Sequence, residues 1–333
     1  MDDDLPTAAL EKIPGGDGPS DQEGSGKNES GLTVIIAFGA NLLVAVAKTV
    51  AAVLTGSASM VAEAAHSWAD TGNEIFLLIA NRRAAQGPDE RHPLGFGRES
   101  YVWSMFAALG LFAAGAAVSI SHGIGQLLHP EPGGDFLIAY IVLALAFVLE
   151  GTSFLQAFRQ VRREAPRADR DILEHALFTS DPTLRAVFAE DAAALIGLVL
   201  AFGGVLAHQL SGSPIPDAIG SIAVGVLLGV VAVILVDRNR RFLLGEEATG
   251  PLRDGAIAAL TDIPEIARIT YLRLEYVGPR QVYFIAAIDL VGDEREHNVA
   301  TALRRLEQQL ETHPAVVQAV LTLSADDEAS ITA

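Results

Sequence analysis

Long hydrophobic runs alternate with short polar connections between Gly31 and Val236. The hydrocarbon core of a bilayer is about 30 Å thick, so a helix needs roughly 20 apolar residues to cross it. Runs of that length predict six membrane-spanning helices, near 32–54, 59–80, 101–128, 135–158, 186–209 and 214–236. We therefore expect a polytopic α-helical membrane protein, with a six-helix transmembrane domain over residues 31–241.

The chain becomes soluble in character after Arg241. Three segments have the two-residue period of β-strands and two have the period of a helix. In chain order these are a helix at 250–261, strands at 269–277 and 281–291, a helix at 294–311 and a strand at 316–323. The order predicts a small cytoplasmic α+β domain over residues 242–333, with an αββαβ, ferredoxin-like arrangement.

Residues 1–30 differ from both of these parts. They are rich in Gly, Asp, Pro and Ser and contain few bulky apolar side chains. Such a segment cannot bury enough surface to offset the entropy of ordering it, so we expect a disordered acidic N-terminal tail. The tail also lacks the basic start and apolar centre of a signal peptide.

The charges between the predicted spans give the orientation. The connections after the second, fourth and sixth spans carry Arg82, Arg83, Arg91 and Arg98, then Arg159, Arg162, Arg163, Arg167 and Arg170, then Arg238, Arg240 and Arg241. The opposite connections contain no Lys or Arg. Because basic loops stay inside, the sequence predicts a multi-pass protein of the cell membrane with both chain ends in the cytoplasm.

Composition narrows the chemistry further. Half of the 333 residues are hydrophobic, only 19% are charged, and the net charge is −18. An acidic balance without a basic stripe argues against nucleic acid as a partner. Cysteine is absent, so a metal bound by this chain must be held by nitrogen and oxygen ligands.

The second predicted span contains four ionisable residues, Glu63, His66, Asp70 and Glu74, on one side of a helix. Each such group at membrane depth costs several kcal/mol unless it is paired, hydrated or coordinated. His66 and Asp70 lie one turn apart near the middle of the span, so one helix can present a nitrogen and an oxygen to the same ion. We expect a metal or proton site there. For Glu63 and Glu74, the alternative is that helix-end acids reach the headgroups.

The fifth predicted span supplies a second acidic pair, Glu190 and Asp191. Small residues surround the pair, which allows another helix to approach closely. The alternative is an interfacial acidic pair near Arg185. Two groups of ligands on different helices are what a cation site at the membrane midplane requires.

Longer motifs carry a resemblance to a known family. They are GSASMVAEAAHSWADTGNEI in the second span, DERHPLGFGRESY at 89–101, SHGIGQLLHPEP at 121–132 and SDPTLRAVFAEDAAALIG at 180–197. With six spans and a small cytoplasmic domain, the chain resembles the cation diffusion facilitators, and within them the mitochondrial zinc transporter 9-like branch.

That resemblance implies a site made of HxxxD or DxxxD on the second span and HxxxD on the fifth, which exchanges Zn²⁺ for protons. His66 and Asp70 match the first pair, and Asp191 matches the acid of the second. Val187 stands where the second His is expected, so Glu190 is the candidate for the missing ligand. This departure leaves the ligand set and the metal preference open. The resemblance also implies a homodimer formed through the cytoplasmic domain.

These observations favour a secondary transporter that exports a divalent cation, zinc first, from the cytoplasm in exchange for protons. The metal is then a transported substrate, and no cofactor is expected. Transport of manganese, iron or cobalt and a degenerate membrane metal sensor or scaffold are the alternatives. An enzyme is not expected, because the sequence has no HExxH, GxSxG or P-loop motif.

Overall fold

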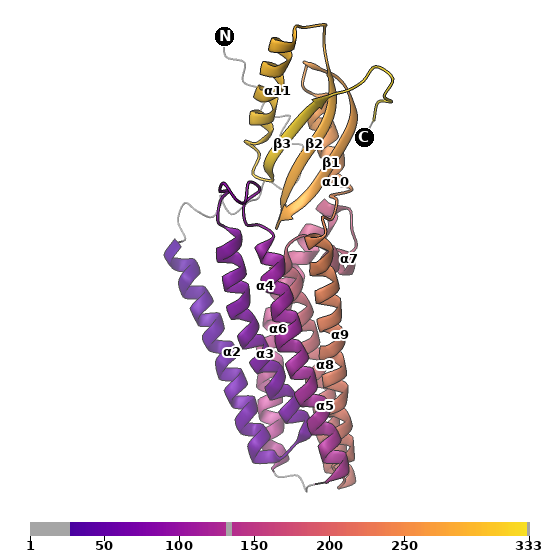
Figure 1. Ribbon diagram of the computed structural model, residues 1–333. Helices are drawn as coiled ribbons and strands as arrows, with labels where there is room; N and C mark the ends of the chain where they lie inside the picture. The colour runs from indigo at the N-terminus through magenta and orange to yellow at the C-terminus, as the bar shows by residue number, and fades with distance from the viewer. Residues whose placement is uncertain (1–26, 131–134, 332–333) are drawn as a thin grey trace.

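The computed structural model describes residues 27–130 and 135–331. The predicted acidic tail at 1–30 lies outside the described residues except for its last four positions, which begin the first helix. The membrane part consists of α2 (Lys27–Thr55), α3 (Ala58–Ala84), α4 (Glu99–Ala107), η2 (Ala108–Phe112), α5 (Ala113–Leu128), α6 (Phe136–Glu164), α8 (Pro182–Ser211) and α9 (Ile215–Leu243). These elements form an elongated bundle that carries a separate sheet domain at one end (Figure 1).

Five stretches of helix in the described residues are long and apolar enough to cross a membrane, in the positions predicted for the first, third, fourth, fifth and sixth spans. Helix α3, the second predicted span, is 27 residues long but is too polar to be among these five. It packs against α2, α4, α5, α8 and α9, so it lies in the centre of the bundle. The most polar of the membrane helices therefore packs against five others.

The third predicted span is not a regular helix throughout. A π-helical turn, η2, separates α4 from α5, and the hydrophobic pattern gives no sign of it. Such turns are frequent at functional sites because they change the direction in which side chains project. Here the turn carries Phe112, whose buried ring lies 6.2 Å from the ring of His66.

The start of α3 is fixed by a carboxylate from another helix. Ser57 caps α3 by accepting a hydrogen bond from Met60 N. Asp217 of α9, which is fully buried, accepts hydrogen bonds from Ser57 Oγ at 2.9 Å, Ala58 N at 2.7 Å and Ser59 N at 3.2 Å. These contacts satisfy free N–H groups of the helix N-terminus and place a negative charge at its positive end.

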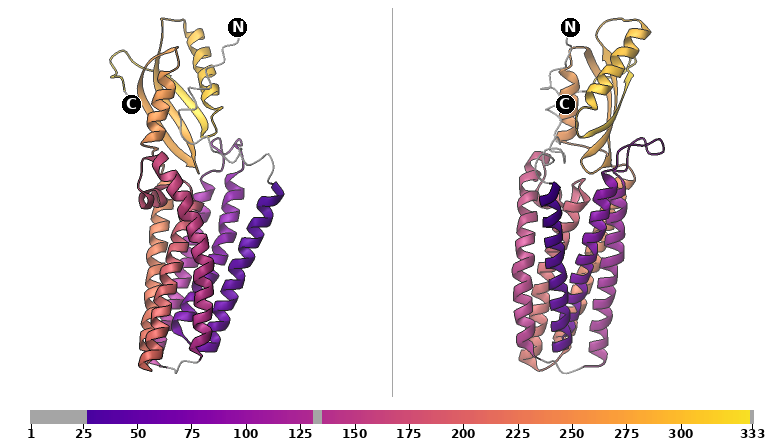
Figure 2. Two further views of the ribbon diagram at one scale, coloured as in Figure 1. Left: turned by 180° about the vertical axis from the view of Figure 1, so that it is seen from behind. Right: turned by 90° about the vertical axis from the view of Figure 1, so that its left-hand side faces the viewer.

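The C-terminal domain contains α10 (Pro251–Thr261), β1 (Ile266–Gly278), β2 (Gln281–Leu290), α11 (Glu296–Leu310) and β3 (Val316–Leu323). This confirms the predicted αββαβ order. The sheet has the strand order β1-β2-β3, with an antiparallel β1–β2 pair and a parallel β2–β3 pair. Apolar residues of both helices, including Leu260 and Leu306, share one core with the inward side chains of the strands. Both helices thus cover the same face of the sheet (Figure 2).

Two short elements that the sequence did not predict, η3 (Ala165–Ala168) and α7 (Ile172–Phe178), lie between α6 and α8. This connection, with residues 85–98 and 244–250, lies at the end of the bundle next to the sheet domain (Figure 1). All three arginine-rich connections are therefore at that end. The opposite end has only the short connections after α2, α5 and α8.

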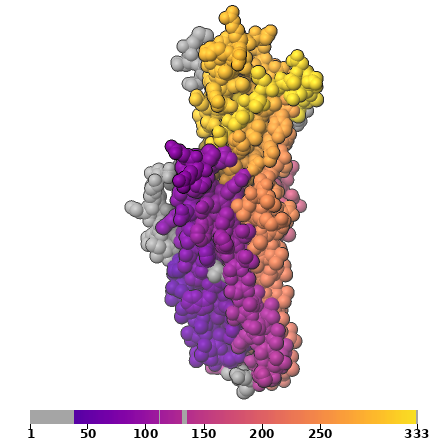
Figure 3. Space-filling view, in the orientation of Figure 1, coloured from indigo at the N-terminus to yellow at the C-terminus, as the bar shows by residue number. Residues whose placement is uncertain are grey.

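The two parts of the molecule are in direct contact. Arg98, before α4, pairs with Glu275 of β1 at 2.5 Å, and Arg280, in the β1–β2 turn, pairs with Glu164 at the end of α6 at 3.1 Å. Gly97 lies so close to β1 that an added Cβ would be 2.5 Å from Val277 O. The space-filling view shows the sheet domain resting directly on the helices (Figure 3).

Candidate metal centre

His66, Asp70 and Glu150 form the only group of three or more His, Cys, Asp or Glu residues in the described chain that could hold one metal ion. One potential ligand atom from each residue lies within 4.8 Å of the other two. His66 Nε2 is 3.5 Å from Asp70 Oδ2, which is the one-turn spacing predicted for this pair. The structure therefore adds Glu150 of α6 to the two residues of α3.

Several polar atoms in this region have no hydrogen-bond partner. They are both ring nitrogens of His66, Asp70 Oδ1, Ser67 Oγ and Glu63 Oε1, and all are buried. Buried polar atoms without partners are rare, because each costs about 1–3 kcal/mol. Such atoms next to a possible ligand group indicate a site that binds an ion or water.

Glu190 and Asp191 point toward different neighbours. Glu190 Oε2 accepts a hydrogen bond from Asn73 Nδ2 at 2.7 Å, and the Glu190 carboxyl group is close enough to that of Asp70 for the two to interact. Asp191 Oδ2 accepts a hydrogen bond from Ser153 Oγ of α6 at 2.8 Å. In this conformation the contact with Asp70 is made by Glu190, the residue suggested to replace the missing His.

One cavity of about 360 Å³ connects these groups. Its lining includes Asp70, Glu74, Glu150, Glu190 and Asp191. The lining segments of α2, α3, α6 and α8 extend from the middle of each helix toward the end with the sheet domain. On the other side of Asp70, His66 and Glu63 are fully buried, so the cavity ends there.

A buried ion-pair cluster lies next to the ligand group. Lys48 Nζ of α2 lies 3.0 Å from Glu63 Oε2 and 2.8 Å from Glu150 Oε1. Glu63 is therefore not a helix-end acid that reaches the headgroups; its side chain is fully buried because it pairs with Lys48. Glu74 lines the cavity and accepts a hydrogen bond from Asn41.

Glu150 is the functional candidate that the sequence reasoning missed. It is the only charged residue between Phe136 and Phe158. The rule applied to the second and fifth spans, that an acid at membrane depth is a functional candidate, would have identified it.

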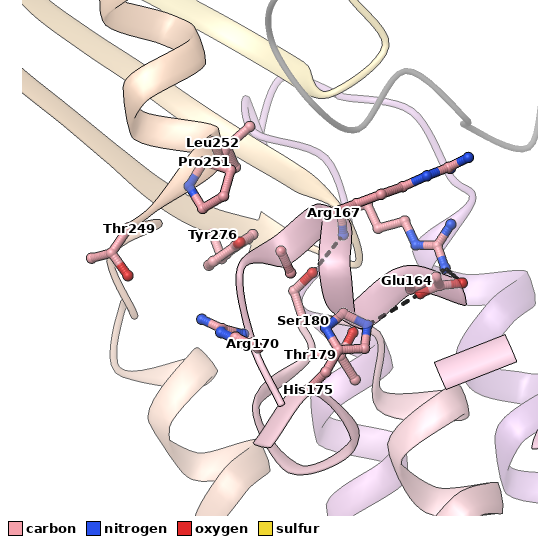
Figure 4. A pocket seen from close by; sticks show the side chains of 12 residues that line it. Glu164, Arg167, Arg170, His175, Thr179, Ser180, Thr249, Pro251, Leu252 and Tyr276 are labelled. Carbon is pink, nitrogen blue, oxygen red and sulfur yellow. Dashed lines mark hydrogen bonds and ion pairs between the residues drawn. The ribbon is translucent and has the colours of Figure 1, made fainter. Parts of the chain in front are cut away.

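A second cavity, of about 220 Å³, lies between the membrane helices and the sheet domain (Figure 4). Glu164 accepts hydrogen bonds from Arg280 there and is 3.4 Å from His175 Nε2. Burial raises the pKa of Tyr276, which keeps its phenol neutral. Because its acid is already ion-paired, this cavity offers no group of free ligands and serves as a junction between the two parts.

The loop after α3 and the isolated histidines show no further metal site among the described residues. His92 Nδ1 is 2.9 Å from Asp89 Oδ1 and its ring lies against Phe96, and these residues are on an exposed loop. His297 and His313, on the sheet domain, belong to no group of ligands.

Comparisons with known proteins agree with the motifs. The family model of the cation efflux transmembrane domain matches residues 34–244. The chain is 36% identical over 266 residues to the mitochondrial proton-coupled zinc antiporter SLC30A9 of Xenopus laevis, which covers 79% of this chain and 47% of that protein. It is 34% identical over 233 residues to metal tolerance protein C4 of Arabidopsis thaliana, which covers 70% of this chain and 51% of that protein.

The fold and its apolar helices define an α-helical membrane protein. The chain belongs to the cation efflux family, the cation diffusion facilitators, and its similarity to SLC30A9 confirms the resemblance to that branch. It spans about half the length of the SLC30A9 relatives that it matches. A more distant relative, magnetosome protein MamB of Magnetospirillum gryphiswaldense, is 23% identical over 246 residues, which cover 73% of this chain and 76% of that protein.

Proposed function

We propose that the protein is a secondary transporter that exports a divalent cation, zinc first, from the cytoplasm in exchange for protons. The observation that carries the proposal is the group of His66, Asp70 and Glu150 at the closed end of a cavity inside the helical bundle. The relatives named as proton-coupled zinc antiporters support the same substrate and coupling.

The donor set suits zinc. Imidazole nitrogen and carboxylate oxygen are both ligand types that bind Zn²⁺. Glu190 and Asp191 line the same cavity and remain the proposed ligands from the fifth span. Because carboxylates dominate the set, manganese, iron and cobalt are the alternative substrates.

Proton exchange is supported by the contact between Asp70 and Glu190. The two carboxyl groups line one cavity and would repel each other if both were ionised, so we expect one of them to hold a proton when no metal is bound. A metal ligand must be deprotonated, so a cation that binds Asp70 and Glu190 displaces that proton. Competition for the same oxygens is sufficient to couple the two fluxes.

The proposed topology has six spans, with α3 as the second span and its ionisable residues Glu63 and His66 buried against other helices. Both chain ends are placed in the cytoplasm on the charge of the connections. The cavity then faces the cytoplasm, which is the loading side for an exporter, and release requires a conformation open to the other side. We also propose a homodimer formed through the C-terminal domain, by analogy with the family.

The cellular membrane in which the protein lies is also a prediction. The charge pattern favours the cell membrane, whereas the SLC30A9 relatives are named as mitochondrial. Localisation of a tagged chain in its own cells distinguishes the two.

The test is zinc flux into proteoliposomes with a trapped pH dye and a trapped zinc dye. Wild type should move zinc and protons in opposite directions, and Asp70→Ala should reduce both to background while still inserting. Asp237→Asn changes an exposed acid that pairs with Arg240 and should transport normally. Zinc binding without flux in wild type would favour a sensor or scaffold, and proton flux driven best by another metal would change the substrate.

A further inference from the structure

Lys48 is an internal cation of the membrane bundle. Its side chain and that of Glu63 have no exposed surface, and Glu150 has 14%. Charges removed from water in this way are costly unless they are paired. The simplest interpretation is a structural clamp that ties α2, α3 and α6 together.

A structural clamp does not require the position that Glu150 has. Its carboxylate contacts Lys48 at 2.8 Å and also belongs to the group with His66 and Asp70. The lysine and a bound metal ion therefore draw on the same side chain. Two cations that share one carboxylate compete for its negative charge.

We propose that Lys48 is a tethered cation that competes with the transported ion for Glu150 and sets the net charge of the site. This inference rests on the proposed function. With their carboxylates ionised for metal binding, Asp70, Glu150 and Glu63 carry three negative charges, of which Lys48 neutralises one. Loss of Lys48 makes the site more negative by one charge and loss of Glu63 makes it less negative by one, whichever acids of α8 also bind the ion.

Glu63 determines how strongly the lysine acts on Glu150. It holds Lys48 from the opposite side, and it is confined by Gly197 of α8, where an added Cβ would lie 2.7 Å from Glu63 Oε1. Without Glu63, Lys48 would pair with Glu150 alone and compete more strongly with the metal. Without Lys48, both Glu63 and Glu150 would be available to attract the metal ion.

Four proteins test the proposal: wild type, Lys48→Met, Glu63→Gln and the double variant. Zn²⁺ affinity is measured in detergent at one pH by competition with a fluorescent chelator, on material that elutes as a single folded species. We expect Lys48→Met to bind about tenfold more tightly and Glu63→Gln about tenfold more weakly. The double variant has the wild-type net charge, so its affinity should return to within about threefold of wild type.

The pattern of opposite single effects and a restored double variant is the signature of charge competition. A clamp predicts losses in both single variants, with a double variant no better than either, and that result would overturn the proposal. Equal affinities in all four proteins would also overturn it. If Lys48→Met does not fold, weaker binding by Glu63→Gln together with recovery in the double variant still tests it.

The control and the wild type separate this inference from the proposed function. Asp237→Asn, an exposed acid-to-amide change outside the cluster, should bind zinc as wild type does. Failure of wild type itself to bind any divalent ion would refute the proposed function. Normal zinc binding by wild type with no opposite effects in the variants would refute only the role of Lys48.

Discussion

Asn73 of α3 donates a 2.7 Å hydrogen bond to Glu190 Oε2 of α8. The amide holds the glutamate carboxyl group on the side of the helix that faces Asp70, and Asp191 is left to contact Ser153 of α6. The acidic doublet therefore divides between two neighbouring helices. This division suggests separate roles for its two members.

We predict that Asp191→Asn abolishes zinc binding, whereas Glu190→Gln retains measurable affinity but flattens the pH dependence of transport. In the proposed mechanism Glu190 takes part in proton exchange beside Asp70, so its amide variant should lose part of the proton release that accompanies binding. Calorimetry of both variants across pH measures affinity and released protons together. Unchanged affinity and proton release in Glu190→Gln would exclude Glu190 from the site, and complete loss of binding would make it a full ligand.

His66→Asp should shift the preference of the transporter toward harder or larger ions such as Mn²⁺ and Cd²⁺. The substitution replaces a borderline nitrogen ligand with a hard oxygen on the same face of α3. Flux of Zn²⁺, Co²⁺, Mn²⁺ and Cd²⁺ into proteoliposomes gives the selectivity series. A series identical to wild type would count against His66 as a ligand.

Glu150→Gln should weaken zinc binding by about tenfold or more, because it removes one of the three charged or basic groups within 4.8 Å. The amide can still accept a hydrogen bond from Lys48, so the protein should remain folded. Asp135→Asn offers an acid-to-amide change at the exposed start of the same helix, outside the cavity of the ligands. Equal zinc affinities in the two variants would show that Glu150 takes no part in binding.

Asp217→Asn should destabilise the membrane domain by about 1–2 kcal/mol, because an amide cannot accept all the hydrogen bonds of the buried carboxylate at the start of α3. Thermal unfolding in detergent, followed by tryptophan fluorescence, measures the change. Asp135→Asn, at an exposed helix cap before α6, serves as the comparison and should have a smaller effect. A loss no greater than that of Asp135→Asn would show that the cap contributes little.

The C-terminal domain was predictable from sequence nearly to its boundaries. The segment expected at 316–323 is β3 itself, and that expected at 250–261 differs from α10 by one residue. Strong two-residue or helical periodicity determines these elements locally. The ferredoxin-like designation stays a prediction, as do the domain boundaries at 30 and 241.

The contacts among the buried charges were not predictable in the same way. Composition identifies Lys48 and Glu63 as unusual, but it does not show that they meet or that Glu150 joins them from 102 positions along the chain. Such pairings depend on which helix faces touch, and the hydrophobic pattern is nearly uniform around these helices. The π-helical turn at Ala108–Phe112 was not predicted for a related reason. One turn with altered hydrogen bonding leaves the hydrophobic run intact, so the sequence pattern does not change.

The ion pair between Glu164 and Arg280 has a mechanical consequence. Glu164 is the last residue of α6, and Glu150 lies on the same continuous helix, about 21 Å away at 1.5 Å per residue. Arg280 lies in the tight turn between β1 and β2. A rotation of the sheet domain would therefore pull on the C-terminal end of α6. A force applied at the junction with the sheet domain would thus be transmitted along one helix to a carboxylate of the proposed metal site.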